Sequence, residues 1–181
     1  MIVLETADMY KGHLKVRQIT VQATPDAPRQ HFEVVTRHDA VAALVFDPAA
    51  RGYLLVEQWR VGAQGPVLEL PAGLIDAGET PEAALRRELR EEIGGEAGEL
   101  TPIATFYTSP GFSTEQIHLF YAEFTERSGV GGGRAEEGEA ISIRVVPADE
   151  FFAMPLADAK TLVAREWAKG NASEMINRSL S

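Results

Sequence analysis

The sequence predicts an α/β protein whose strands form a mixed sheet. Short segments rich in apolar residues are spread over positions 13–73 and 103–147, and two longer helical segments occupy 81–93 and 159–170. Strands interleaved with helices are typical of a layered α/β domain. A chain of 181 residues is long enough for one such domain with a sizeable core.

The first predicted strands lie in a β-rich region that covers residues 1–38. There, HLKVRQITVQ alternates apolar and polar residues with one break, and a turn over TPDAPR separates it from HFEVVTR. AVAALVF and YLLVEQWR are expected to form a hairpin around DPAARG, and VLELPAG is expected to form a short strand that runs into a glycine. Later strands are expected on either side of a loop within 103–124, and over 140–147.

The clearest helix follows this region. Thr80 suits the N-cap and Pro81 the first helical position, while strong helix formers continue to Ile93 and Gly94-Gly95 ends the helix. Its start and its end are therefore both marked in the sequence.

Three further segments complete the chain. SGVGGGR, at 128–134, is glycine-rich enough to be expected as a mobile loop. A short helix is expected over 148–154, and Asp158 can cap a last helix that ends at Gly170.

Composition restricts the functions open to the chain. It has no cysteine, which excludes thiolate metal sites and cysteine nucleophiles and suits the reducing cytoplasm. Neither a signal peptide nor a membrane-spanning segment is expected, since no basic segment precedes an apolar run and no apolar stretch is long enough. A formal net charge of −10 without a segregated basic run argues against nucleic-acid binding.

Three acidic residues crowd onto one turn near the end of the clearest helix. Glu88 and Glu92 are four residues apart with Glu91 beside them, so the three share an arc of about 100°. Like charges at this spacing destabilise a helix by about 0.2–0.5 kcal/mol per pair. Mg²⁺ prefers carboxylate oxygens combined with substrate phosphates and water, so a metal site explains the crowding. Taken alone, the helix would be interpreted instead as an ordinary solvated helix with ion pairs, because runs of charge are usually solvated faces.

The wider spacing around this helix closely resembles the box of the Nudix hydrolase family. The match consists of Gly73, five residues, Glu79, seven residues, and then Arg87-Glu88-Leu89-Arg90-Glu91-Glu92-Ile93-Gly94. All charged and glycine positions are filled. Only Gly95 departs, because the family usually has an apolar residue there. So many specified positions at fixed spacing make the motif far more specific than a lone glycine pattern.

The flanking segments are similar to the ADP-ribose pyrophosphatase group of that family. The similar segments are EQWR at 57–60, LPAG at 70–73, SPGFSTE at 109–115, EEGEAI at 136–141 and DAKT at 158–161. The resemblance implies the Nudix fold over 39–181, with a mixed sheet sandwiched between helices (α/β/α). It also implies an N-terminal antiparallel β extension over 1–38 and a homodimer whose N-terminal strands pack across the interface or exchange.

The implied reaction is hydrolysis of the diphosphate of ADP-ribose to AMP and ribose 5-phosphate by metal-activated water. It would require Mg²⁺, or Mn²⁺, with two or three ions per site. The implied metal ligands are the carbonyl of Ala72 and the carboxylates of Glu88, Glu92 and Glu139. Glu137 is the implied base, although it and Glu139 could exchange roles.

Three charged residues of the box have supporting roles by the same resemblance. Glu91 is a further ligand or a support, Arg87 orients the acidic residues through ion pairs, and Glu79 braces the loop before the helix.

The implied substrate-binding residues are Arg60, Glu33, Phe32, Gly73, Pro110, Gly111 and Glu115. Arg60 can grip a phosphate with two N–H groups. Members of the group often carry an arginine where Phe32 stands, and Arg29 or Arg37 could substitute for it. Hydrolysis of another nucleotide sugar, such as GDP-mannose or UDP-glucose, is therefore an alternative. A non-catalytic nucleotide sensor is a second alternative, against which the complete set of box acids argues.

Overall fold

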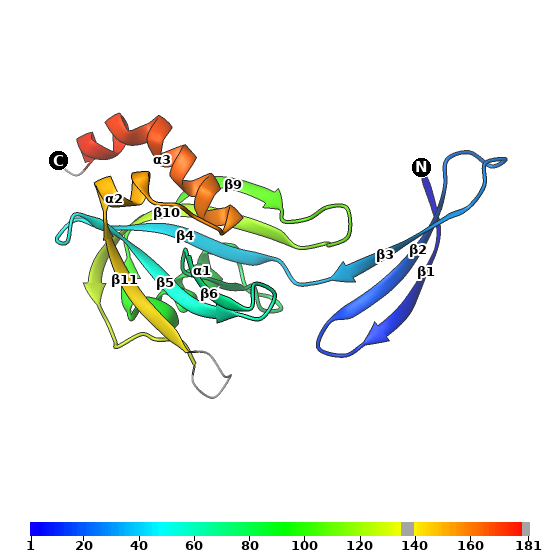
Figure 1. Ribbon diagram of the computed structural model, residues 1–181, viewed down its shortest axis with the longest axis horizontal. Helices are drawn as coiled ribbons and strands as arrows, with labels where there is room; N and C mark the ends of the chain where they lie inside the picture. The colour runs from blue at the N-terminus through cyan, green and yellow to red at the C-terminus, as the bar shows by residue number, and fades with distance from the viewer. Residues whose placement is uncertain (135–139, 179–181) are drawn as a thin grey trace. The chain divides into compact units, whose positions relative to one another are not determined.

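The computed structural model describes residues 1–134 and 140–178, with side chains up to Asn171 (Figure 1). The chain divides into two compact units. The first contains Met1–Asp39 and Phe106–Ile117, and the second contains Ala40–Thr105 and His118–Ser181.

The first unit is built on a three-stranded antiparallel sheet in the order β1-β2-β3. Its strands are β1 (Ile2–Lys11), β2 (Lys15–Gln22) and β3 (Gln30–Thr36). The segment 106–117 joins β3 through backbone hydrogen bonds, from Val35 N to Phe112 O at 2.7 Å and from Thr114 N to Val35 O at 3.1 Å. The sequence pattern indicated a β-rich region here but did not separate β1 as a strand.

The larger sheet has the order β11-β5-β4-β10-β8, with β6 paired to β5, β7 to β4 and β9 to β10. Its strands are β4 (Ala40–Asp47), β5 (Gly52–Arg60), β6 (Gly65–Glu69), β7 (Ala72–Leu74), β8 (Gly95–Ala97), β9 (Thr101–Tyr107), β10 (Gln116–Arg127) and β11 (Ile141–Pro147). The strand predicted over 67–73 is in fact two strands with different neighbours. Pro71 lies at the change, because it has no N–H to donate to a ladder.

Helices cover both faces of this sheet: α1 (Pro81–Ile93) lies on one face, and α2 (Ala148–Ala153) and α3 (Ala159–Arg178) lie on the other (Figure 1). The predicted α/β/α class is thus confirmed. The prediction that the last helix ends at Gly170 is wrong. A glycine inside a helix costs only about 1 kcal/mol, and here the Asn171 side chain donates to Trp167 O one turn earlier.

The core lies on both sides of β4, whose residues 41–45 are all fully buried. Val41, Ala43 and Val45 pack in one cluster with Leu85 and Leu89 of α1. The opposite side of β4 contacts α3. Burial on both faces explains why this strand is continuously apolar rather than alternating. Among the described helices, none combines the length and the apolar character needed to cross a membrane.

Candidate active site

Helix α1 presents the acidic residues of the motif from a rigid support. The Thr80 hydroxyl accepts a hydrogen bond from Ala83 N at 3.2 Å, and Pro81 begins the helix, so the N-terminus is capped as the sequence predicted. Leu85 and Leu89 fix the apolar stripe of the helix in the core. The adjoining arc of carboxylates is therefore held in a fixed direction.

Glu92 is the most deeply buried of these acids, with 3% of its surface exposed. Its Oε2 accepts a hydrogen bond from Ala72 N at 2.8 Å, and its Oε1 accepts one from the Gln58 side chain at 3.1 Å. Such donors are needed because an ionised carboxylate is costly to bury without them. The bond to Ala72 ties the end of α1 to β7, where the predicted carbonyl ligand lies.

Glu88 lies directly against the backbone of Gly73, which pairs with Val41 across β7 and β4. A Cβ atom added to Gly73 would overlap the Glu88 carboxyl group. The glycine of the motif is therefore required by the close approach of an acidic side chain, not by a turn. This brings Ala72, Gly73, Glu88 and Glu92 together in one place.

Arg87 links the acidic arc to the loop before the helix. Its guanidinium donates to both carboxylate oxygens of Glu79, at 3.2 and 2.9 Å, and to Leu74 O at 2.9 Å. Its Nη1 donates to Glu88 Oε1 at 2.5 Å and lies 3.6 Å from Glu91 Oε2. One cation thus restrains two neighbouring acids while holding the loop in place.

These contacts also shift the pKa values of the pair. The hydrogen bond from Arg87 holds the pKa of the Glu79 carboxyl below its ordinary value. The pairing with Glu79, and then with Glu88, raises the pKa of the Arg87 guanidinium. Both groups are consequently charged at neutral pH.

The glycine-rich segment predicted to be mobile is instead bonded to the end of α1. Four backbone N–H groups donate to carbonyl groups of the helix end: Ser128 and Gly129 to Gly94, Gly132 to Glu92 and Gly133 to Glu91, at 2.9–3.0 Å. Gly94 is the C-cap with φ +64°, a conformation that favours glycine. The segment therefore satisfies carbonyl groups that the helix leaves without partners.

Gly95, the one departure from the motif, has a compensating neighbour. It belongs to β8 and pairs with Arg127 of β10. A Cβ atom at Gly95 would overlap the ring of Phe124, a residue packed against the core. The ring of Phe124 thus occupies the space where a side chain at position 95 would begin.

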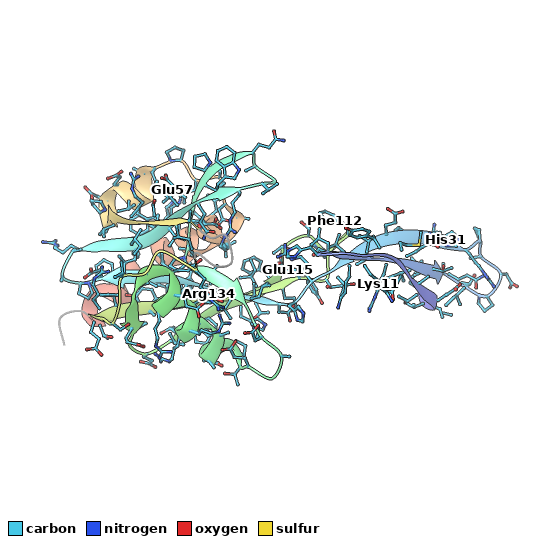
Figure 2. The ribbon with its side chains drawn as sticks, turned by 90° about the horizontal axis from the view of Figure 1, so that it is seen from below. Lys11, His31, Glu57, Phe112, Glu115 and Arg134 are labelled. Atoms are coloured by element: carbon cyan, nitrogen blue, oxygen red, sulfur yellow. The ribbon has the colours of Figure 1, made fainter. Side chains whose placement is uncertain are left out.

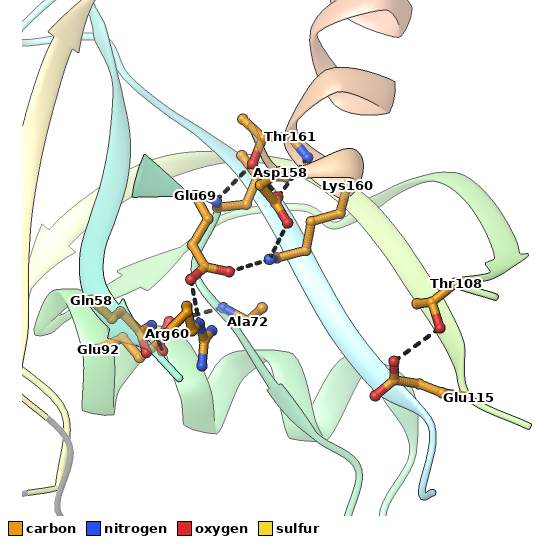
Figure 3. Close-up of polar contacts among 11 residues, drawn as sticks. Gln58, Arg60, Glu69, Ala72, Glu92, Thr108, Glu115, Asp158, Lys160 and Thr161 are labelled. Atoms are coloured by element: carbon orange, nitrogen blue, oxygen red, sulfur yellow. Dashed lines mark hydrogen bonds and ion pairs between the residues drawn. The ribbon is translucent and has the colours of Figure 1, made fainter. Parts of the chain in front are cut away.

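Arg60 ends β5, two residues after Gln58 and on the same face of the strand. Its Nε donates to Glu69 Oε1 at 2.5 Å (Figure 3). Burial alone would lower the pKa of the Arg60 guanidinium, but the bond to Glu69 and the nearby charge of Glu92 raise it. Sequence reasoning assigned no role to Gln58 or Glu69, although the two-residue spacing of Gln58 and Arg60 placed them on one face.

The other predicted substrate residues belong to the first unit. Glu33 and Phe32 lie on β3, and Phe32 is 46% exposed. Pro110 and Gly111 lie in the segment before β10, as does Glu115, which is labelled in Figure 2.

Glu115 has two partners within this unit. Its carboxylate accepts from the Thr108 hydroxyl at 3.0 Å and lies 3.3 Å from the Arg37 Nε. Arg37, one of the two predicted substitutes for a missing arginine, is thus already paired with a predicted substrate residue.

Two predicted residues, the base Glu137 and the ligand Glu139, lie outside the described residues. Their assignments stay predictions.

The described residues suit a divalent cation but do not form a complete cage. Glu88 and Glu92 offer hard oxygen ligands beside the backbone of Ala72, in a space that exists because Gly73 lacks a Cβ atom. Among the side chains that the structure describes, in residues 1–134 and 140–171, no three acidic or histidine groups gather closely enough to bind a metal by themselves. An ion held here would need further oxygen atoms from substrate and water, as is usual for Mg²⁺.

Comparison with known proteins agrees with the motif and the fold. Residues 36–167 match the family model described as NUDIX domain. Since this match covers most of the chain, the protein belongs to the NUDIX family, as the sequence predicted. A solved structure described as an ADP compounds hydrolase shares the fold, with a TM-score of 0.75 and 21% identity over 94% of this chain and 95% of that chain.

Three relatives with different names are similar to this chain. A GDP-mannose pyrophosphatase of Citrobacter koseri is 33% identical over 161 residues, which cover 82% of this chain and 84% of that protein. An ADP-ribose pyrophosphatase of Bacillus subtilis is 40% identical over 99 residues, which cover 55% of this chain and 53% of that protein. A methanol dehydrogenase activator of Bacillus methanolicus is 28% identical and covers 91% of this chain.

Proposed function

We propose that this protein is a divalent-metal-dependent hydrolase of the diphosphate in nucleotide sugars, with ADP-ribose as its leading substrate. The observation that carries the proposal is the junction of β7 and α1. There, Glu92 is bonded to Ala72 N and Glu88 rests against Gly73, so two carboxylates and a backbone segment form one oxygen-rich surface. The products would be AMP and ribose 5-phosphate.

In this proposal, Ala72, Glu88, Glu92 and Glu139 hold Mg²⁺ or Mn²⁺, in two or three ions. When bound, the metal neutralises the diphosphate and lowers the pKa of water. Arg87 keeps the carboxylates in position, with Glu91 as ligand or support, and Glu137 accepts the proton of the attacking water. Arg60 binds a phosphate oxygen.

The residues proposed for the sugar-bearing half of the substrate come from the sequence resemblance alone. Glu33 and Glu115 would bind hydroxyl groups, and Phe32, Pro110 and Gly111 would form the surroundings. Gly73, which lies against the Glu88 carboxylate, would be part of the diphosphate site. We also propose that the protein is a cytoplasmic homodimer, with residues 1–38 as the dimerisation region and 39–181 as the hydrolase domain.

GDP-mannose is the second candidate substrate. The relative named for GDP-mannose is similar over 82% of this chain, whereas the one named for ADP-ribose is similar over 55%. Phe32 also stands where the ADP-ribose group often has an arginine. UDP-glucose is a third candidate of the same chemical class.

The test is a kinetic comparison of ADP-ribose, GDP-mannose and UDP-glucose with Mg²⁺ and with Mn²⁺. We expect the highest kcat/KM for ADP-ribose, and a clear preference for a hexose nucleotide would move the assignment to that substrate. Binding of ADP-ribose without turnover under either metal would instead identify a nucleotide sensor.

Glu92→Gln tests the metal role in the same assay. Loss of one ligand charge should lower kcat about 100-fold or more, because even residues that only support ligands contribute up to about that much. The circular dichroism spectrum should be unchanged, because the glutamine side chain keeps one oxygen that can accept a hydrogen bond from Gln58 or from Ala72 N. Near-normal turnover of this variant would refute the role.

A further inference from the structure

Four charged side chains form a chain of alternating sign beside the site, which we call the Arg60–Asp158 network (Figure 3). Its members are Arg60 at the end of β5, Glu69 at the end of β6, and Lys160 and Asp158 at the start of α3. Glu69 Oε1 accepts from Arg60 Nε at 2.5 Å, and Glu69 Oε2 accepts from Lys160 Nζ. Lys160 also donates to Asp158 Oδ1 at 3.0 Å.

The same network joins α3 to the strand before the motif. Asp158 Oδ2 accepts from Thr161 N at 3.0 Å and from its hydroxyl at 2.6 Å, which caps the helix. The Thr161 hydroxyl in turn accepts from Leu70 N at 3.0 Å. The position of Glu69 is therefore fixed from two sides, by its own strand and by the first turn of α3.

Stability alone gives a weak reason for this arrangement. The side chains of Glu69 and Lys160 are 3% and 9% exposed, so both charges have lost most of their water. Buried ion pairs rarely stabilise a fold more than apolar residues of the same volume would. The effect of the network on Arg60 gives a stronger reason for it. Arg60 is the most exposed member, with 44% of its side chain exposed.

Glu69 holds Arg60 by one nitrogen only. In the described part of the chain, no hydrogen bond engages Nη1 or Nη2 of Arg60. A guanidinium fixed at Nε keeps a defined plane and leaves these two nitrogens for an anionic ligand. Two parallel N–H groups are the arrangement that binds a phosphate most specifically.

Arg60 is also close enough to the acidic site to be affected by it, since the charge of Glu92 contributes to the raised pKa of Arg60. Gln58, two residues earlier on the same strand, donates directly to Glu92. Strand β5 thus carries both a contact to the acidic helix and the two Nη groups of Arg60 that Glu69 does not engage.

We propose that Glu69 is a positioning residue, which together with Lys160 directs the Nη groups of Arg60 to the diphosphate of the substrate. The proposal rests on the proposed function for the identity of that diphosphate. It adds an assignment for a buried carboxylate, and for the first turn of α3, that the motif does not contain.

The test is a double-mutant cycle of Arg60→Ala and Glu69→Gln, with KM and kcat measured separately. Glutamine offers one acceptor oxygen to two cations, so Arg60 or Lys160 loses its partner. We expect Glu69→Gln to raise KM about tenfold and to change kcat less than about threefold, because a charge-assisted hydrogen bond and uniform binding are lost. In the Arg60→Ala background, Glu69→Gln should change KM less than about twofold.

Glu57→Gln is the matched control. Glu57 lies on the same strand, is labelled in Figure 2, and makes a 3.8 Å ion pair with Arg144 at the surface. The substitution is the same as at position 69, but Glu57 does not contact the network. KM should therefore stay within about twofold of the original value. If Glu69→Gln does not fold, Glu69→Asp takes its place, since it keeps the charge beside Lys160 but withdraws the carboxylate from Arg60.

Two outcomes overturn the proposal while leaving the proposed function intact. In the first, Arg60→Ala raises KM and Glu69→Gln does not. In the second, the two effects multiply, as expected for a purely structural role of Glu69. The same double-mutant cycle is repeated with the dissociation constants of ADP-ribose and GDP-mannose, measured by calorimetry. The proposal can therefore be tested even if the protein binds these compounds without hydrolysing them. A chain that neither cleaves nor binds these compounds would refute both proposals.

Discussion

At Gly73, the lack of a single methyl group leaves room for the Glu88 carboxyl. Gly73→Ala should destabilise the protein by about 1–3 kcal/mol, as overpacking of a filled site does, and should also abolish most activity. Gly62→Ala is the control, because nothing lies within 4 Å of a Cβ atom at Gly62. It should stay within about 0.5 kcal/mol of the original stability. Chemical denaturation and turnover of both variants check this expectation, which equal stability of the two would contradict.

The pairing of Glu79 with Arg87 predicts a pH dependence at the scale of one residue. Because the pKa of Glu79 is lower in the folded than in the unfolded state, its contribution is present above pH about 4.5 and is lost as pH falls below that value. Glu79→Gln should therefore melt at a lower temperature than the original protein at pH 7, and the difference should shrink between pH 4.5 and 3.

Thermal melts at several pH values measure this difference. Glu99→Gln, which alters an exposed carboxylate outside the motif, should follow the original protein throughout. A difference for Glu79→Gln that persists unchanged at pH 3 would show that its ionisation is not involved.

Single residues were predictable where their partners are near in sequence. Glu79, Arg87, Glu88 and Glu92 were found from fixed spacings, because a helix and the loop before it place them together. The bonds of Gln58 to Glu92 and of Glu69 to Lys160 span 34 and 91 residues, and no local pattern indicates contacts over such separations. The roles of Glu137 and Glu139 depend on a segment outside the described residues.

At the scale of elements, the N-cap of α1 decides how firmly the acidic arc is held. Thr80→Ala removes the acceptor for Ala83 N and should cost about 1 kcal/mol, whereas Thr80→Ser should restore most of it. Denaturant titration measures both variants. An alanine variant as stable as the serine variant would mean that the hydroxyl does not cap the helix.

Predictions of helices, strands and loops were wrong where a tertiary contact outweighed a local sequence rule. Glycine content suggested a mobile segment at 128–134, but the N–H groups there find acceptors on α1. Gly170 suggested a helix end, but α3 continues to Arg178. The strand expected over 67–73 changes neighbours at Pro71, which a periodicity of two residues cannot reveal.

At the scale of the whole molecule, exposed apolar side chains of the first unit predict association. Ile2, Val3, Leu4 and Tyr10 of β1 are 42–62% exposed, a concentration that is unusual for a strand facing only water. Light scattering after size-exclusion chromatography should give about twice the chain mass of 19.7 kDa at micromolar concentration. Val3→Lys combined with Leu4→Lys should shift the protein toward monomer.

Val145→Lys is the control for association, because Val145 is similarly exposed but lies on β11 of the second unit. It should leave the dimer intact. A single-chain mass for the original protein would contradict the prediction.

The α/β class was predictable because alternation, capping and chain length are properties of the sequence itself. The continuous apolar character of residues 40–46 predicted a buried strand. Burial on both faces of β4 agrees with this prediction. The order of strands in the sheet was not predictable, because it depends on pairings between distant segments.

The hydrogen bond from Ala72 N to Glu92 also makes one amide proton an intrinsic probe of the acidic site. Amide protons that donate to a carboxylate resonate downfield, and a bond of 2.8 Å to a nearly buried acceptor should exchange slowly with solvent. When a cation withdraws electron density from Glu92, that resonance should move upfield. A titration with Mg²⁺ followed in the ¹⁵N-labelled protein would thus report occupancy of the site without any substrate present.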